Sequence, residues 1–190
     1  MKAYIFLADG FEEVEALTTA DLLIRAGVET KLVKVPEGDE NGCKAVRGSH
    51  NIKVKPDLTL GMDIAAADLM DGDCVVLPGG MPGTKNLAAS RDVIDTIKAY
   101  DAAGKVVAAI CAAPSVLGIN GLLNGKEATC FPGFEDKLNG AKHVSEGAVA
   151  DGNIVTGKSM GSAVTFGIKL IEVLLGKEAA DKTEASIYRG

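Results

Sequence analysis

An apolar run that stops at a cysteine is the feature that most constrains the fold of this chain. Residues Lys105–Ile110 form the run, and Cys111 follows it directly. A run of this kind is typical of a strand that is buried on both faces of a parallel sheet. Pro114, followed by small and apolar residues up to Ile119, favours a helix that begins a few residues later. The sequence therefore predicts that Cys111 lies on a sharp turn between a central strand and a helix.

Such a turn has the geometry of a nucleophile elbow. An elbow lifts a reactive atom above the carboxyl edge of the sheet and leaves neighbouring backbone N–H groups free to bind an oxyanion. We also expect the N-terminus of the following helix to lower the pKa of the Cys111 thiol. A cysteine among alanines is often only a small buried hydrophobe, however, so both interpretations of Cys111 stay open at this point.

The composition favours a layered α/β protein and disfavours charged macromolecular partners. Apolar residues make up 47% of the 190 residues and aromatic residues only 4%, so the core must consist mainly of Ala, Val, Leu and Ile. Such a core favours helices layered on a parallel sheet, and this length favours one domain over residues 1–190. The net charge of −6 and the absence of any Lys/Arg-rich run argue against nucleic acid or an anionic membrane as a partner. A small neutral or polar substrate is expected instead.

The termini and the cysteines bear on the compartment. The apolar stretch at 3–8 is too short for the core of a signal peptide or for a membrane span, so we expect a cytoplasmic protein. No C-x-x-C pair occurs, which argues against a zinc site and against a thioredoxin-type couple. In a reducing compartment free thiols are expected, and no metal is predicted. The four cysteines concerned are Cys43, Cys74, Cys111 and Cys130.

Apolar stretches and turn residues predict alternating strands and helices. This order indicates a flavodoxin-like, doubly wound, mostly parallel sheet in a three-layer αβα sandwich. Ser90 is expected to cap one of the helices, and the tail after Gly176 is weakly specified. Strands are expected at 3–7, 29–35, 74–77, 105–110 and 127–130, helices at about 13–26, 65–70, 91–103 and 162–175, and hairpins at 44–55 and 144–156.

Three sequence features are expected to meet at one edge of this sheet, where doubly wound folds bind ligands. Glu15 follows the first strand and is close to helical register with Leu22 and Leu23, so it can point inward. A carboxyl held there is partly desolvated and can stay protonated near neutral pH. Gly79 and Gly80 follow another strand and can bring backbone N–H groups close to a ligand. The third feature is the cysteine of the elbow.

Two acids and a histidine near the first helix have simpler explanations. Glu12 and Glu13 stand at the expected start of that helix, where they stabilise its dipole. His50 lies in the turn of the first hairpin, where a histidine is usually only solvated. The alternative for His50 is a place near the candidate site.

The start of the first helix, the double-glycine loop and the cysteine elbow together resemble the ThiJ/PfpI superfamily, in particular the branch of Parkinson disease protein 7, the parkinsonism-associated deglycase. The resemblance rests on Gly10–Glu15, Leu77–Gly80 and Ala109–Pro114, and it covers nearly the whole chain. It implies that Cys111 is the reactive cysteine and that Glu15 is a protonated carboxyl that hydrogen-bonds the sulfur. It also implies oxyanion donors from the backbone N–H groups of Gly80 and Ala112.

The resemblance gives further residues a place and also shows departures. His50 stands where the human member has an arginine that reaches the partner's site, so the resemblance places it, with Gly79 and Phe131, around the reactive pair. Phe131 occupies the position of a histidine near the cysteine in the human member, so that general base is absent. The peptidase branch has a histidine directly after its cysteine, whereas this chain has Ala112. A proteolytic Cys-His dyad is therefore not expected.

The resemblance implies an activity and leaves alternatives. The implied activity is that of a cofactor-free glyoxalase or deglycase of the stress response, with a small carbonyl compound such as methylglyoxal, glyoxal or an early adduct as substrate. One alternative is a redox sensor whose Cys111 is oxidised to the sulfinate. Another is a chaperone-like dimer without chemistry. A homodimer through the first helix and the hairpin around His50 is also implied, with no nucleic acid, membrane, metal or cofactor as partner.

Overall fold

A seven-stranded sheet forms the centre of the computed structural model, which describes residues 1–36 and 45–188. The strand order is β10-β11-β7-β6-β1-β2-β5, and each neighbouring pair is parallel except β10 with β11. When the parallel strands β1, β2, β6, β7 and β11 are numbered 1 to 5 along the chain, they lie side by side in the sheet in the order 2-1-3-4-5. This is the strand order of flavodoxin-like folds. The predicted fold class is therefore confirmed. The strands are β1 (Lys2–Leu7), β2 (Glu29–Lys34), β5 (Leu58–Thr59), β6 (Cys74–Leu77), β7 (Val106–Ile110), β10 (Ala148–Asp151) and β11 (Ile154–Gly157).

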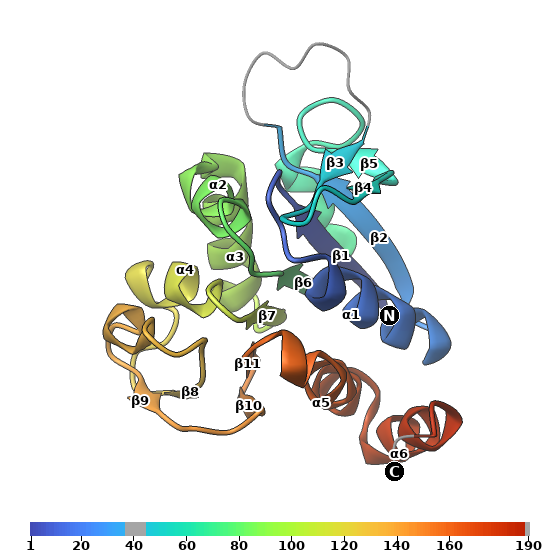
Figure 1. Cartoon of the computed structure of the whole chain (residues 1–190), viewed down its shortest axis with the longest axis vertical. Coiled ribbons are helices and arrows are strands. Elements are labelled where there is room, and N and C mark those ends of the chain that lie inside the picture. The colour runs from blue at the N-terminus through green and yellow to red at the C-terminus, as the bar shows by residue number, and fades with distance from the viewer. Residues whose placement is uncertain (37–44, 189–190) are drawn as a thin grey trace.

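Helices cover both faces of the sheet (Figure 1). Because successive side chains of a strand point to opposite faces, each inner strand contributes to two separate cores. In β1, Tyr4 and Phe6 pack with one set of helices, and Ile5 and Leu7 pack with the other. Burial on both faces explains why β7 has no polar residue. One face carries α1 (Glu13–Arg25) and α5 (Ala163–Leu175), and the other carries α2 (Gly83–Ala89), α3 (Arg91–Ala102) and α4 (Pro114–Ile119).

Shorter elements lie outside the main sheet. The hairpin predicted at 44–55 is confirmed by the antiparallel pair β3 (Val46–Arg47) and β4 (Lys53–Val54), although residue 44 lies outside the described residues. The strand expected at 127–130 is only the two-residue β8 (Glu127–Ala128), which pairs in parallel with β9 (Lys142–His143). The described residues also form the 3₁₀ helices η1 (Ala66–Asp71), η2 (Glu135–Lys137) and η3 (Met160–Ser162).

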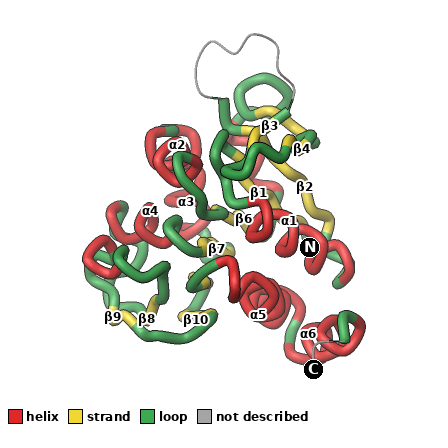
Figure 2. Tube along the Cα trace, in the orientation of Figure 1, coloured by secondary structure: helices red, strands yellow, loops and turns green. Residues whose placement is uncertain are grey.

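Among the described residues, the α-helices α2 and α6 (Lys177–Ser186) were not predicted; Figure 2 shows both as separate helical segments. Each has few large apolar side chains. Helix α2 has only Leu87 as a large buried residue. Helix α6 contacts α5 through a surface on which Ala180 and Thr183 are buried. Neither segment has the apolar stripe from which a helix is predicted. The predicted cap of α3 is present, because Ser90 Oγ accepts a hydrogen bond of 3.4 Å from the backbone N–H of Val93.

The described residues were compared with two further expectations, on membrane spans and on the cysteines. Among the described residues, no helix combines the length and the apolar character needed to cross a membrane. Cys74, Cys111 and Cys130 are free thiols, as predicted, whereas Cys43 lies outside the described residues.

Candidate active site

Cys111 lies on the predicted sharp turn between β7 and α4. Its φ is +66°, a left-handed conformation that is costly for a residue with a side chain. Neighbouring segments hold the turn in place: the Cys111 N–H donates to the Gly157 carbonyl at 2.9 Å, and the Cys111 carbonyl accepts from the Phe131 N–H at 2.8 Å. Strained residues of this kind persist where the surroundings fix them, and they are common at functional sites.

Glu15 is buried beneath this turn in the first turn of α1. Its side chain is inaccessible to solvent, and its Oε2 accepts a hydrogen bond of 2.8 Å from the Gly79 N–H. Within the described part of the chain, its Oε1 has no hydrogen-bond partner. Burial raises the pKa of Glu15 to about 7, although the Cys111 thiol and the Gly79 N–H act in the opposite direction. The predicted inward, readily protonated carboxyl is therefore present.

Gly79 allows the cysteine and the carboxyl to meet. A Cβ on Gly79 would lie 2.7 Å from Cys111 Cβ and 2.7 Å from Glu15 Oε2. The next residue, Gly80, has a φ of +88°, and a Cβ there would contact the backbone of Gly10 and Glu12. Two glycines are therefore needed for the loop after β6 to pack against the start of α1.

The predicted lowering of the Cys111 pKa is wrong. Burial, followed by the charge and hydrogen bonding of the Glu15 carboxylate, raises the pKa of the Cys111 thiol to about 12. The backbone N–H groups of Ala112 and Gly80 bond to the sulfur and act in the opposite direction, but they do not prevail. Helix α4 spans only six residues, so its dipole is small.

The ionisations of Cys111 and Glu15 are coupled. The Glu15 carboxylate raises the pKa of the thiol, and the hydrogen bond from the thiol lowers the pKa of the carboxyl. Transfer of the thiol proton to the carboxylate would form a thiolate beside a carboxylic acid, which combines a nucleophile with a proton donor.

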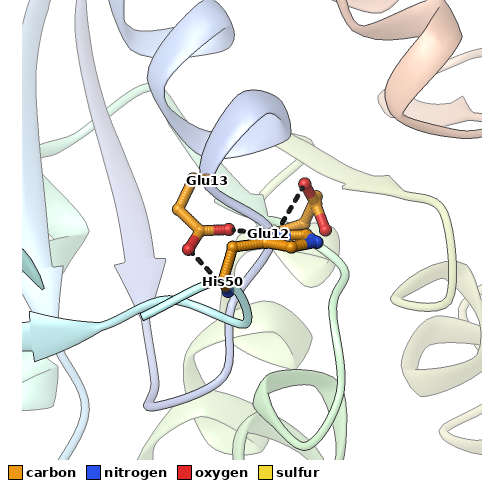
Figure 3. Close-up of side chains that lie close together, drawn as sticks. All are labelled: Glu12, Glu13 and His50. Carbon is orange, nitrogen blue, oxygen red and sulfur yellow. Dashed lines mark hydrogen bonds and ion pairs between the residues drawn. The ribbon is translucent and has the colours of Figure 1, made fainter. Parts of the chain in front are cut away.

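The remaining predicted residues occupy two places. Phe131 lies next to Cys111 through its backbone N–H, and its side chain is half-exposed. His50 instead contacts the start of α1 of its own chain (Figure 3). The ring Nδ1 of His50 lies 2.9 Å from Glu13 Oε2, and the backbone N–H of His50 donates a hydrogen bond of 2.8 Å to Glu13 Oε1. Dipole stabilisation alone was therefore too simple an explanation of Glu13. The placement of His50 across a dimer stays a prediction.

Comparisons with known proteins identify the family of this chain. Residues 1–173 match the DJ-1/PfpI family. The chain is 38% identical over 178 residues to protein dj-1beta of Drosophila melanogaster, which covers 93% of this chain and 90% of the relative. It is 30% identical over 169 residues to the glutathione-independent glyoxalase DJR-1.2 of Caenorhabditis elegans, with 88% and 84% covered. The solved structure of oxidized DJ-1 from Toxoplasma gondii superposes with a TM-score of 0.87 at 34% identity, covering 98% of this chain and 97% of that one.

Proposed function

Because the chain belongs to the DJ-1/PfpI family, we propose that it is a cofactor-free, cysteine-dependent enzyme of the stress response that converts small α-oxoaldehydes into α-hydroxy acids. Methylglyoxal, glyoxal and their early adducts on amines or thiols are the proposed substrates. The observation that carries the proposal is the buried Glu15 carboxyl, whose Oε1 has no partner among the described residues, beside Cys111. The C. elegans relative, which is named a glyoxalase, supports this reaction class.

The proposed reaction begins at the sulfur. The Cys111 thiolate adds to the aldehyde carbon, and the N–H groups of Gly80 and Ala112 stabilise the resulting oxyanion. Glu15 first gives its proton to this oxyanion and becomes a carboxylate. The carboxylate then takes the hydrogen of the same carbon as a proton and delivers it to the neighbouring carbon, by way of an enediol. The first carbon is thereby oxidised and the second reduced, which leaves a thioester of the hydroxy acid. Water hydrolyses the thioester to lactate or glycolate and regenerates the thiol.

The test is a steady-state assay of methylglyoxal loss with quantification of lactate. Cys111→Ala and Glu15→Gln should each abolish lactate formation, since one removes the nucleophile and the other removes the proton carrier. Cys130→Ala is the matched control, because Cys130 is a buried thiol whose pKa burial raises to about 11. Full methylglyoxal consumption by purified Cys111→Ala would exclude the proposed mechanism.

Differential exposure of the cysteines favours redox sensing as a second candidate function. Among the described cysteines, Cys74 and Cys130 are buried, whereas Cys111 is partly exposed. Mild peroxide should therefore add two oxygens to Cys111 before it modifies any other cysteine, with Glu15 hydrogen-bonded to the sulfinate. Mass spectrometry of peptides follows this order, and uniform oxidation of all cysteines would contradict it.

Free thiols also accord with the cytoplasmic location that we propose.

An apolar surface on α1 supports the proposal of a homodimer. Val14, Leu17 and Ile24 are 43%, 37% and 59% exposed, and their spacing places them on one face of the helix. Ile52, in the nearby loop between β3 and β4, is 55% exposed. Exposed apolar groups that gather in this way are typical of protein interfaces. We propose that a second copy of the chain covers them.

A further inference from the structure

A second cluster of chemically capable side chains lies where the β3–β4 loop meets the start of α1 (Figure 3). Glu12, Glu13 and His50 each offer one ligand atom there, and the three atoms lie within 4.8 Å of one another. His50 Nδ1 is 2.9 Å from Glu13 Oε2 and 3.8 Å from Glu12 Oε1. Tetrahedral zinc, with bonds of about 2.0–2.2 Å, separates its ligand atoms by roughly 3.3–3.6 Å. The two observed distances lie on either side of this range.

The hydroxyl of Ser49 occupies the remaining side of the cluster. Its Oγ lies 3.2 Å from Glu12 Oε2, 3.2 Å from Glu13 Oε2 and 3.1 Å from His50 Nδ1. Four potential donor groups, those of Glu12, Glu13, His50 and Ser49, therefore lie close together. A single hydroxyl hydrogen can serve only one of the surrounding carboxylates.

Glu13 is held as a metal ligand needs to be held. Its side chain is only 5% exposed. Its Oε1 accepts a hydrogen bond of 2.8 Å from the backbone N–H of His50, and this bond turns Oε2 toward the imidazole ring. A Cβ on Gly48 would strike the Glu13 carboxylate, so the glycine leaves the space that this group occupies. Hydrogen bonds that orient a ligating carboxylate in this way are typical of metal sites.

The charges in the cluster do not balance. Within the described ranges, the ion pairs of Glu12 and Glu13 are those with His50, whose imidazole carries at most one positive charge. Two carboxylates thus face one imidazole, which leaves negative charge at a partly buried position. A divalent cation would neutralise both carboxylates and leave the imidazole neutral.

We propose that Glu12, Glu13 and His50 bind one divalent first-row transition-metal ion, such as Zn²⁺ or Co²⁺, with the Ser49 hydroxyl or a water on the fourth side. Imidazole nitrogen together with carboxylate oxygen suits these ions, and three protein ligands with one further position is a common arrangement. The ion joins the β3–β4 loop to the first turn of α1. The lack of cysteine pairs, which argued against zinc, has no bearing on a site made of histidine and carboxylates. Cys111 and Glu15 are not ligands of this site, although the charge of Glu12 acts on the Glu15 carboxyl.

The test is a titration of the full chain with Co²⁺, followed by visible absorption and by isothermal calorimetry with Zn²⁺. The Cys111→Ser background removes the partly exposed thiol as a competing ligand. We expect one ion per chain, and we expect His50→Gln and Glu12→Gln to weaken binding at least about tenfold. His143→Gln is the matched control, because His143 is an exposed histidine outside the cluster and its loss should leave the affinity unchanged.

The outcomes separate a metal site from a simple ion pair. Unchanged binding in both His50→Gln and Glu12→Gln, or no saturable binding at one ion per chain, would overturn the proposal. Equal loss in His143→Gln would likewise point to adventitious binding by surface histidines. Glu12 lies at the edge of the cluster with its side chain 16% exposed, so Glu12→Gln remains decisive if circular dichroism shows that His50→Gln disturbs the fold. Methylglyoxal turnover is not a readout here, so failure of the metal site and failure of the proposed activity remain distinguishable.

Discussion

The backbone N–H of Gly79 donates a hydrogen bond of 2.8 Å to Oε2 of Glu15, whereas Oε1 of the same carboxyl has no partner within the described residues. A buried oxygen without a donor disfavours the ionised carboxylate, since the charge on it is not stabilised. The proton of Glu15 is therefore expected on Oε1. The loop after β6 thus fixes the orientation of the carboxyl, whereas burial favours its protonated form.

The rate of methylglyoxal conversion should rise with pH through a value near 7. Below that pH, Glu15 is protonated and Cys111 is a thiol, so the pair holds two protons and no nucleophile forms. Loss of one proton near pH 7 allows the thiolate form. A profile of kcat/KM from about pH 5 to about pH 9 measures this step. A profile without an inflection in that range would show that the pair does not control the rate.

Glu15→Gln should change how stability depends on pH. The pKa of Glu15 is about 7 in the folded state, against an ordinary value of 4.5. Between these values the folded protein keeps a proton that the unfolded chain has lost, so its stability falls as pH rises through this window. The shift corresponds to a loss on the order of 3 kcal/mol, which the neutral glutamine should not show.

Urea unfolding gives the free energy of unfolding of the wild type and of Glu15→Gln at about pH 4.5 and at about pH 8. The change between the two pH values is then compared between the two proteins. The wild type should lose more stability than the variant over this interval. An equal change in both proteins would mean that the carboxyl ionises in the folded state as it does in water.

Cys111→Gly should be at least as stable as Cys111→Ala. Glycine ordinarily costs about 0.5–1 kcal/mol relative to alanine, because the unfolded chain gains freedom. At Cys111, however, the φ of +66° costs a residue with a side chain roughly 1–2 kcal/mol, and glycine avoids this cost. Thermal unfolding of the two variants decides the comparison. A clearly less stable Cys111→Gly would show that the turn stores no strain.

The elements that the sequence predicted best are those whose own residues determine them. Strand β6 (Cys74–Leu77) was predicted at its observed bounds, because a short apolar run ends at Pro78 and a glycine loop. Glu15 was placed correctly because helical register relates it to the buried Leu22 and Leu23. Helix α6 was missed because its stability comes from contact with α5, while its own sequence is mostly polar.

The pKa of Cys111 and the cluster at His50 could not be predicted in this way. The thiol pKa depends on the depth of burial and on the distance to Glu15, which are properties of the assembled sheet edge. Similarly, His50 and Glu13 are 37 residues apart in the chain, and only the hairpin brings them together. In the sequence, only Gly48, next to Ser49, indicates that a side chain from elsewhere packs against this loop.

Leu17→Lys should weaken the proposed homodimer. Leu17 lies between Val14 and the rest of the exposed apolar face of α1, so a lysine there places a charge inside the interface. Light scattering coupled to size-exclusion chromatography should show a dimeric wild type and a larger monomer fraction for the variant. Met62→Lys is the control, since Met62 is 82% exposed and lies away from α1, in the loop after β5. A monomeric wild type would contradict the proposal.

Gly79→Ala should inactivate the enzyme without replacing any group that reacts. The new methyl group would lie 2.7 Å from both Cys111 Cβ and Glu15 Oε2, so one of these side chains must move by several tenths of an ångström or more. A displacement of about 1 Å at a reacting pair can cost about a hundredfold in rate, and we expect a loss in kcat/KM of that order. The matched control is Gly161→Ala, because the nearest atom to a Cβ there is Ser159 Oγ at 3.8 Å. Its activity should equal that of the wild type. If Gly79→Ala keeps full activity while folded by circular dichroism, the close approach of Cys111 and Glu15 is not what the reaction requires, and catalysis by this pair must be abandoned.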